Sequence, residues 1–312
     1  MANSILVVGE VADGALVPIT AEMLGAARRL GAGSVACVLI GSGVEANAKD
    51  AIAFGADEAL VVDSGDFAAY NPDAYLQALL HVVESASGGS PAIILFGQTN
   101  LGRDLAPRLA FRLNTGVIMD TVELALAGDR LQGTRPAYGG NARAVNVVRA
   151  DPQIATVRAK SQNALERDDA RSGATTKVDI TIDASAVRIK VTERKGMPAE
   201  GVRLEDADVV VTGGRGMGGA VGASRAVCDL GWRPVSEQIG LTGKVVSPTL
   251  YIAVGVSGAS QHMAGCSGAK NIVAINKDPD ANIFKSSRFG IVDDFSKVMK
   301  PLIEAAKSEK AS

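Results

Sequence analysis

The first half of the chain alternates short, continuously apolar runs with segments that have helical periodicity. The apolar runs are strand-like and begin at Ser4, Ser34, Glu58 and Ala92. A helix is predicted to open at Pro18, because a proline in the first helical turn leaves no extra backbone N–H unpaired. Continuously apolar strands separated by helices predict a parallel sheet that is covered on both faces.

The pattern changes after about Val122, where strand-like runs follow one another without helices between them. These runs begin at Val122, Ala142, Ile154 and Val178. They predict antiparallel strands, or a β-rich extension of the first α/β domain. The stretch from Val122 to the run at Val178 therefore does not continue the alternation of strands and helices.

A polar, turn-rich segment at residues 193–207 is the best candidate for a linker. Beyond it, a second α/β pattern starts at Asp208 and ends in a predicted helix after Phe295. The sequence therefore predicts an N-terminal parallel-sheet α/β domain with its β-rich extension at 1–192. A second, doubly wound α/β domain follows at 208–312.

Composition excludes several classes of protein. With 312 residues, 47% of them hydrophobic, the chain can bury at least one full core, and its length favours two domains. Its net charge of −2 gives no footprint for nucleic acid or an anionic membrane. Three scattered cysteines and two histidines argue against a disulfide framework and a metal centre. No apolar run reaches the ~18–20 residues of a membrane helix. Without a leader-like N-terminus, we expect a cytoplasmic protein, or one of the mitochondrial matrix if a leader had been removed.

The glycine-rich segment 212–227 is the first candidate for a ligand site. Gly214, Gly216 and Gly219 satisfy the spacing GxGxxG, and small residues after a strand let backbone N–H groups approach a phosphate. A nicotinamide site would also need an immediate helix and an acidic residue about 20 positions later. Pro234 occupies that region, so a plain glycine turn is the favoured interpretation.

Polar residues follow three predicted strands of the C-terminal half. The strand at 250–254 runs into a Gly/Ser turn at 255–260, the next strand ends at Asn276, and the last is followed by Asp294. The carboxyl ends of strands in an open α/β sheet form its usual ligand crevice. The sequence therefore predicts a ligand site at this edge.

Each of these residues also has an ordinary structural interpretation. A lone histidine such as His262 is more often a surface or capping residue, and Arg225 suits a solvated helix face. Asn276 and Asp294 are common loop formers. Trp232, the only tryptophan, is expected to anchor a core or an interface. The order and spacing of the whole set carry the functional interpretation.

Taken together, the segments GGRG, VGASRA, QIGLTGK, YIAVGVSGASQHMAG and AINKDPDANIF closely resemble the alpha subunit of electron transfer flavoproteins. The resemblance covers nearly the whole chain, because FGQTNLGRDLAPRLAFRL and RPAYGGN are similar to that family's N-terminal domain. The region 250–294 is the most specific part, being long and ungapped.

The resemblance implies a heterodimer with an electron transfer flavoprotein beta subunit, and flavin adenine dinucleotide (FAD) held mainly by the C-terminal domain. It places Arg225 against the flavin ring, the Thr242 hydroxyl toward N5 and His262 at the O2 carbonyl. It implies no catalytic residue and no metal ligand. The cofactor-binding residues it implies are Arg215, Ser224, Arg225, Gln238, Ile239, Gly240, Leu241, Thr242, Ser257, Gly258, Ala259, Ser260, Gln261, His262, Asn276, Asp294 and Phe295.

The chemistry agrees with these implied roles. An electron carrier must stabilise a reduced, negatively charged flavin, and a cation together with a hydrogen-bond donor does so in a dry pocket. Two departures from the family stand out: Leu241 replaces a glutamine, and only residues 217–220 separate GGRG from VGASRA, where the family has a helix-length segment. A parallel crossover normally needs a dozen or more residues.

The expected function is to shuttle electrons from acyl-CoA dehydrogenases or related flavoenzymes to a downstream acceptor. Two alternatives stay open. One is a subunit of an NADH-dependent, electron-bifurcating complex, which RPAYGGN favours. The other is an adenine-nucleotide-binding regulatory subunit without redox activity.

Overall fold

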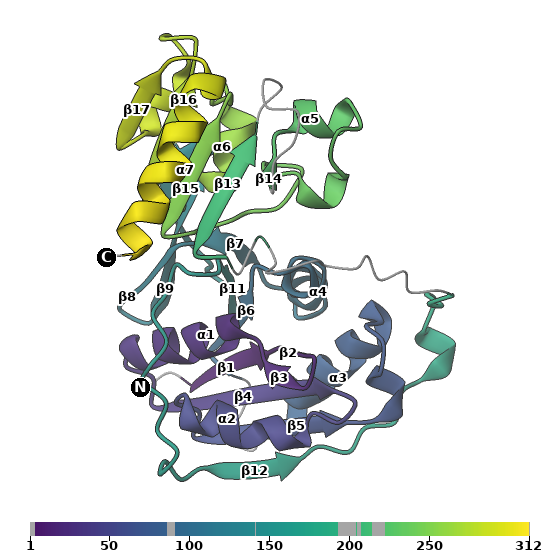
Figure 1. The fold of residues 1–312 in the computed structure, drawn as a ribbon. Coiled ribbons are helices and arrows are strands. Elements are labelled where there is room, and N and C mark those ends of the chain that lie inside the picture. The colour runs from purple at the N-terminus through teal and green to yellow at the C-terminus, as the bar shows by residue number, and fades with distance from the viewer. Residues whose placement is uncertain are drawn as a thin grey trace. The chain divides into compact units, whose positions relative to one another are not determined.

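The computed structural model describes residues 4–85, 91–140, 142–192, 204, 207–213 and 222–311. It divides into two compact units, each described by itself below (Figure 1). Unit 1 comprises Met1–Pro136 and Arg143–Gly196. Unit 2 comprises Ala137–Ala142 and Met197–Ser312. Arg215, together with most of the predicted linker, lies outside the described residues.

Unit 1 is built on a seven-stranded sheet with the order β12-β5-β4-β1-β6-β11-β7. Neighbouring strands run parallel along the sheet. The strands are β1 (Ser4–Gly9), β4 (Ser34–Gly41), β5 (Glu58–Asp63), β6 (Ile93–Gly97), β7 (Val117–Thr121), β11 (Gln153–Val157) and β12 (Ala174–Lys177).

Helices cover both faces of this sheet. Alternate side chains of a strand point to opposite faces, and Val7 accordingly packs with Met23 of α1 whereas Leu6 packs with Leu79 of α3. The predicted parallel sheet with two covered faces is confirmed, and α1 begins at Pro18 as expected. The helices are α1 (Pro18–Arg29) and α2 (Ala48–Ala53) on one face, and α3 (Pro72–Ser85) and α4 (Asn100–Arg112) on the other.

Short elements complete unit 1. They are the hairpin β2 (Val11–Ala12) and β3 (Ala15–Leu16), and the 3-10 turns η1 (Glu45–Asn47), η2 (Gly65–Phe67) and η4 (Ala184–Ala186). A separate sheet has the order β10-β9-β8 and consists of β8 (Glu123–Ala127), β9 (Arg130–Ala137) and β10 (Ala142–Val147).

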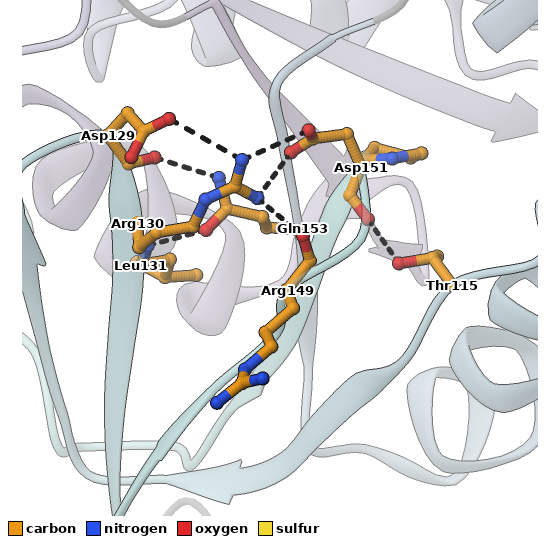
Figure 2. A network of polar contacts seen from close by, with 8 residues as sticks. Thr115, Asp129, Arg130, Leu131, Arg149, Asp151 and Gln153 are labelled. Carbon is orange, nitrogen blue, oxygen red and sulfur yellow. Dashed lines mark hydrogen bonds and ion pairs between the residues drawn. The ribbon is translucent and has the colours of Figure 1, made fainter.

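Polar contacts fasten this small sheet to the strand β11 (Figure 2). The Arg130 guanidinium pairs with Asp151 at 2.9 Å, and the Gln153 amide donates to the carbonyl of Asp129 at 2.9 Å. The Gln153 side-chain oxygen accepts from the Leu131 N–H. The start of β9 and the turn residue before it are therefore held against β11 and the residues that precede it.

Two strand predictions in this region were wrong. The run from Ile154 is not antiparallel: β11 lies between β6 and β7 and is parallel to both. The run from Val178 is no strand. Instead, the exposed residues of β12 pair with β5, while Val178 and Ile180 pack against the core as irregular chain.

Unit 2 contains a five-stranded sheet with the order β14-β13-β15-β16-β17, and each neighbouring pair is parallel. The strands are β13 (Val209–Gly213), β14 (Gly222–Ala223), β15 (Leu250–Val254), β16 (Asn271–Asn276) and β17 (Phe289–Val292). The other elements are η3 (Tyr138–Gly140), α5 (Arg225–Asp229), η5 (Val235–Glu237), α6 (Ser260–Cys266), η6 (Asn282–Ser286) and α7 (Phe295–Ala311).

The connection after β13 is short, and β14 still pairs with β13 in the sheet. β14 has only two residues, yet it pairs parallel with β13 through Thr212 and Gly213. The residues between these strands, 214–221, lie outside the described part of the chain. Together, the two α/β units confirm the predicted fold class.

Candidate functional site

A cavity of about 990 Å³ lies in unit 2 at the carboxyl ends of β15, β16 and β17. The predicted crevice at this sheet edge is therefore present, and its volume is at the upper end of the usual range for ligand sites. The implied cofactor residues that line it are Ser224, Arg225, Gln238, Ile239, Gly240, Leu241, Thr242, Ser257, Ala259, Gln261, His262, Asn276, Asp294 and Phe295.

Not every implied residue lines the cavity, and several lining residues were missed. Gly258 in the adjoining turn and Ser260 at the start of α6 lie outside the lining. The missed residues are Ala226, Asp229, Leu230, Trp232, Gly255, Val256, Ile275, Lys277 and Asp293. Trp232 does not belong to the core, since 46% of it is exposed. The five-residue helix α5 before it covers too little surface to bury an indole.

The turn from β15 into α6 depends on Gly258. Its φ of +77° lies in the left-handed region, and a Cβ there would overlap the backbone nitrogen of Ile283. The Ile283 N–H donates to the Ser257 carbonyl at 3.1 Å, which ties η6 to this turn. Gly258 thus fixes the backbone of the turn whose neighbouring residues, Ser257 and Ala259, line the cavity.

A second close approach positions residues 238–244. A Cβ at Gly265 of α6 would overlap the backbone of Gly240, whose own φ is +149°. The Leu241 N–H donates to the Gln261 carbonyl at 2.7 Å. The loop is therefore fixed against the helix by backbone contacts, while the Leu241 side chain remains 63% exposed.

His262 is one of the buried polar side chains of the cavity wall. Its exposed fraction is 7%, and its Nε2 lies 2.9 Å from Oη of Tyr251. Its Nδ1 is buried and makes no hydrogen bond among the described residues, and the Ile239 carbonyl is the backbone acceptor beside the ring. Burial lowers the pKa of His262 to about 4, so the ring is neutral near pH 7.

Gln238 orients the hydroxyl of Thr242. The Gln238 side chain is buried, and its Nε2 donates to Thr242 Oγ1 at 2.9 Å. With a lone pair of the hydroxyl engaged in this way, the O–H proton is directed to another acceptor. The pair can therefore offer a donor to a ligand atom.

Arg225 brings a positive charge to the cavity on an exposed side chain. The side chain is 71% exposed, and its Nε lies 3.3 Å from Oδ2 of Asp229 one helical turn later. Asp229 lines the same cavity. The guanidinium is thus held on its own helix and is not packed into the wall.

The far end of the cavity is formed by residues with local structural bonds. Asn276 donates to the Val256 carbonyl at 2.9 Å. Asp294 accepts from the Ser296 N–H at 2.9 Å and from its hydroxyl, and this hydroxyl lowers the pKa of Asp294. Asn276 and Asp294 therefore also have the structural role of loop formers.

Within the described ranges, no group of histidine, cysteine or acidic side chains could hold a metal ion. The cysteines are all buried and unpaired. No helix in the same ranges is long and apolar enough to cross a membrane. The cavity offers hydrogen-bond donors, the two exposed cations Arg225 and Lys277, and apolar surface.

Comparison with known proteins assigns both units. The family described as "Electron transfer flavoprotein domain" matches residues 5–183, and the one described as "Electron transfer flavoprotein FAD-binding domain" matches residues 217–267. The second match includes much of the cavity lining.

Full-length relatives agree with these matches. A protein named electron transfer flavoprotein subunit alpha from Bacillus subtilis is 41% identical, over 98% of this chain and 98% of that protein. One of the same name from Thermoanaerobacterium thermosaccharolyticum is 43% identical, over 99% of each. The acryloyl-CoA reductase electron transfer subunit beta of Anaerotignum propionicum is 32% identical, over 96% of this chain and 95% of that protein. The chain therefore belongs to the family of electron transfer flavoprotein alpha subunits.

Proposed function

We propose that this chain is the FAD-binding alpha subunit of a heterodimeric electron transfer flavoprotein. It carries electrons from acyl-CoA dehydrogenases or related flavoenzymes to a downstream acceptor, in the cytoplasm. The observation that carries the proposal is the cavity of unit 2, where a buried, unpartnered His262 Nδ1 lines a space of about 990 Å³. An unpartnered buried polar atom is costly, and a ligand that pairs with it removes this cost.

The residues present fit a flavin. Bound FAD would supply the redox centre, since its ring system accepts and releases electrons. Thr242 and His262 would donate to its polar edge, and Arg225 would add a positive charge nearby. Ile239 and Val256 add buried apolar wall, which keeps water from the ring.

The remaining lining residues suit the other parts of the dinucleotide. The turn at 257–259 and the first residues of α6 would provide the approach for the diphosphate, with Gly258 allowing the tight backbone path. Arg215, outside the described residues, is proposed as a further cofactor contact. Asn276, Asp294 and Phe295 form the end proposed for the adenosine. Leu241 gives apolar contact where the family has a glutamine.

The proposal is tested with the chain co-expressed with an electron transfer flavoprotein beta subunit. The purified complex should be 1:1 and yellow, release FAD on denaturation, and be reduced by an acyl-CoA dehydrogenase in the presence of its substrate. A colourless complex that stays colourless in excess FAD would contradict cofactor binding. A yellow complex that is not reduced would contradict only the choice of donor.

A second candidate is a subunit of an NADH-dependent, electron-bifurcating complex. It is favoured by the relative whose name includes acryloyl-CoA reductase. Anaerobic addition of NADH to the complex separates the two candidates, because a simple carrier is not reduced by it. Bleaching of the flavin absorption by NADH would support bifurcation.

A further inference from the structure

The phenol of Tyr251 lies behind the cavity wall. Tyr251 is on β15, is fully buried, and packs in the unit 2 core with Met263 and Cys266 of α6. It is absent from the cavity lining, whereas His262, whose Nε2 it contacts at 2.9 Å, belongs to that lining. Tyr251 can therefore act on a bound ligand only through His262.

The two ring nitrogens of His262 have unequal surroundings. Nε2 is engaged by Tyr251, whereas Nδ1 is buried and has no hydrogen-bond partner within the described residues. A neutral imidazole has one N–H donor and one acceptor nitrogen, and the bond made at one nitrogen decides which tautomer is present. Whatever Tyr251 does at Nε2 therefore decides whether Nδ1 donates or accepts.

We propose that Tyr251 is a positioning residue that donates its hydroxyl proton to Nε2 and thereby holds His262 as the Nδ1–H tautomer. The cavity then receives a neutral N–H donor from His262. This inference rests on the proposed function for the identity of the acceptor, a carbonyl oxygen of the flavin. The tautomer itself can be tested without any cofactor.

Three observations support this direction of donation. A neutral imidazole nitrogen is a good acceptor, and a phenol is a good O–H donor. Burial lowers the pKa of His262 to about 4 and raises the pKa of Tyr251 well above its usual value, so both groups stay neutral near pH 7. The Thr212 hydroxyl beside the phenol acts to lower the pKa of Tyr251, as a group that donates to the phenol oxygen does, and the sulfur of the Cys266 thiol is only a weak acceptor.

The arrangement determines the kind of ligand atom that His262 selects. An Nδ1–H donor can pair with a carbonyl oxygen of a ligand but not with a ligand N–H, which is itself a donor. Because the ring is neutral, its contribution does not depend on protonation of the histidine above about pH 5. His262 is therefore expected to act as a constant donor rather than as a cation that appears on acidification.

Nitrogen NMR of the full chain tests the tautomer directly. The chain, labelled with ¹⁵N-histidine and assembled with an unlabelled beta subunit without FAD, gives signals from only two histidines, His81 and His262. His262 should show a protonated Nδ1 and an unprotonated Nε2 at pH 7. Tyr251→Phe, which removes only the hydroxyl, should abolish this fixed assignment. Tyr70→Phe is the matched control, because Tyr70 bonds Asp104 in unit 1.

Cofactor affinity provides the second measurement. Tyr251→Phe should weaken FAD binding about three- to tenfold, the effect of one neutral hydrogen bond, and Tyr70→Phe should not change it. A protonated Nε2 in the wild type would overturn the proposal, as would an unchanged tautomer in Tyr251→Phe. If Tyr251→Phe does not fold, the wild-type spectrum alone still decides. A wild type with the expected tautomer but no FAD binding would defeat the proposed function and leave the role of Tyr251 standing.

Discussion

Arg225 illustrates how exposure limits what one charged residue can contribute. Its side chain is 71% exposed and paired with Asp229, so its charge is screened by water and partly neutralised by its neighbour. An exposed pair of charges contributes up to about 1 kcal/mol. The effect of Arg225 on a bound flavin should therefore be modest.

Arg225→Ala is expected to lower the first reduction potential of bound FAD by about 40 mV. This corresponds to about 1 kcal/mol, since about 59 mV is a tenfold change for a one-electron couple. Potentiometric titration of the heterodimer measures it. Arg233→Ala is the control, because Arg233 pairs with Glu237 in the same unit but does not line the cavity. Equal potentials in the two variants would contradict the placement of Arg225.

Glu10 in unit 1 makes stability depend on pH. Burial raises its pKa from 4.5 to about 7, although Thr99 donates to its carboxylate at 2.7 Å. The folded state thus binds the proton more tightly than the unfolded chain does. The contribution of Glu10 to the free energy of unfolding is accordingly highest below about pH 4.5 and falls as the pH rises to about 7.

Glu10→Gln should remove the part of this pH dependence that comes from Glu10, while Glu22, whose pKa burial also raises to about 7, keeps its own part. The amide keeps an acceptor for Thr99. At pH 8 the variant should be more stable than the wild type by up to about 3 kcal/mol, and near pH 4.5 about equally stable. Urea unfolding followed by circular dichroism measures both units, and fluorescence of Trp232, the only tryptophan, follows unit 2. If the stability difference between Glu10→Gln and the wild type were the same at pH 4.5 and pH 8, burial would not have raised the pKa of Glu10.

At the scale of elements, the turn between β15 and α6 is predicted to fail if Gly258 gains a side chain. Gly258→Ala adds both a left-handed φ penalty and an overlap with the Ile283 backbone. Gly231→Ala is the matched control, because its φ is +73° and its Cβ would meet open space. The control should lose about 1–2 kcal/mol. Gly258→Ala should lose several kcal/mol and should not retain FAD; equal melting temperatures would contradict this.

The elements also show where sequence reasoning succeeds. Continuous apolar runs such as β1 and β6 are buried on both faces, so the runs marked these strands correctly. β12 could not be found in this way, because its residues are all exposed and only pairing with β5 makes them a strand. Similarly, nothing within β11 indicates that it is inserted between β6 and β7, which come earlier in the chain.

The cavity was predictable only in part. Motif matches and strand ends pointed to most of its lining, because such residues are contiguous in sequence. Trp232 and Lys277 were missed since their place depends on how separate loops meet, which no local pattern records. The partner of His262 was missed for the same reason, because Tyr251 reads as an ordinary strand residue.

At the scale of the whole molecule, we predict that the chain forms an obligate heterodimer. It exposes large apolar side chains, among them Phe111, Leu241, Phe289 and Ile303. Light scattering should show a 1:1 complex with a beta subunit, and self-association of the isolated chain at micromolar concentration. A soluble monomer whose mass does not change on adding the beta subunit would contradict the prediction.

Because the short turn η3 belongs to unit 2, that unit is formed by two separate segments of the chain. Ala137–Ala142 is part of unit 2, and Gly140 lies so close to Ser267 that a Cβ would be 3.1 Å from its side chain. The flanking strands β9 and β10 belong mainly to unit 1. A fragment cloned from residue 197 onward would therefore lack a piece of its own surface beside α6. Excising or transplanting the cofactor-binding unit requires that this turn be carried along with it.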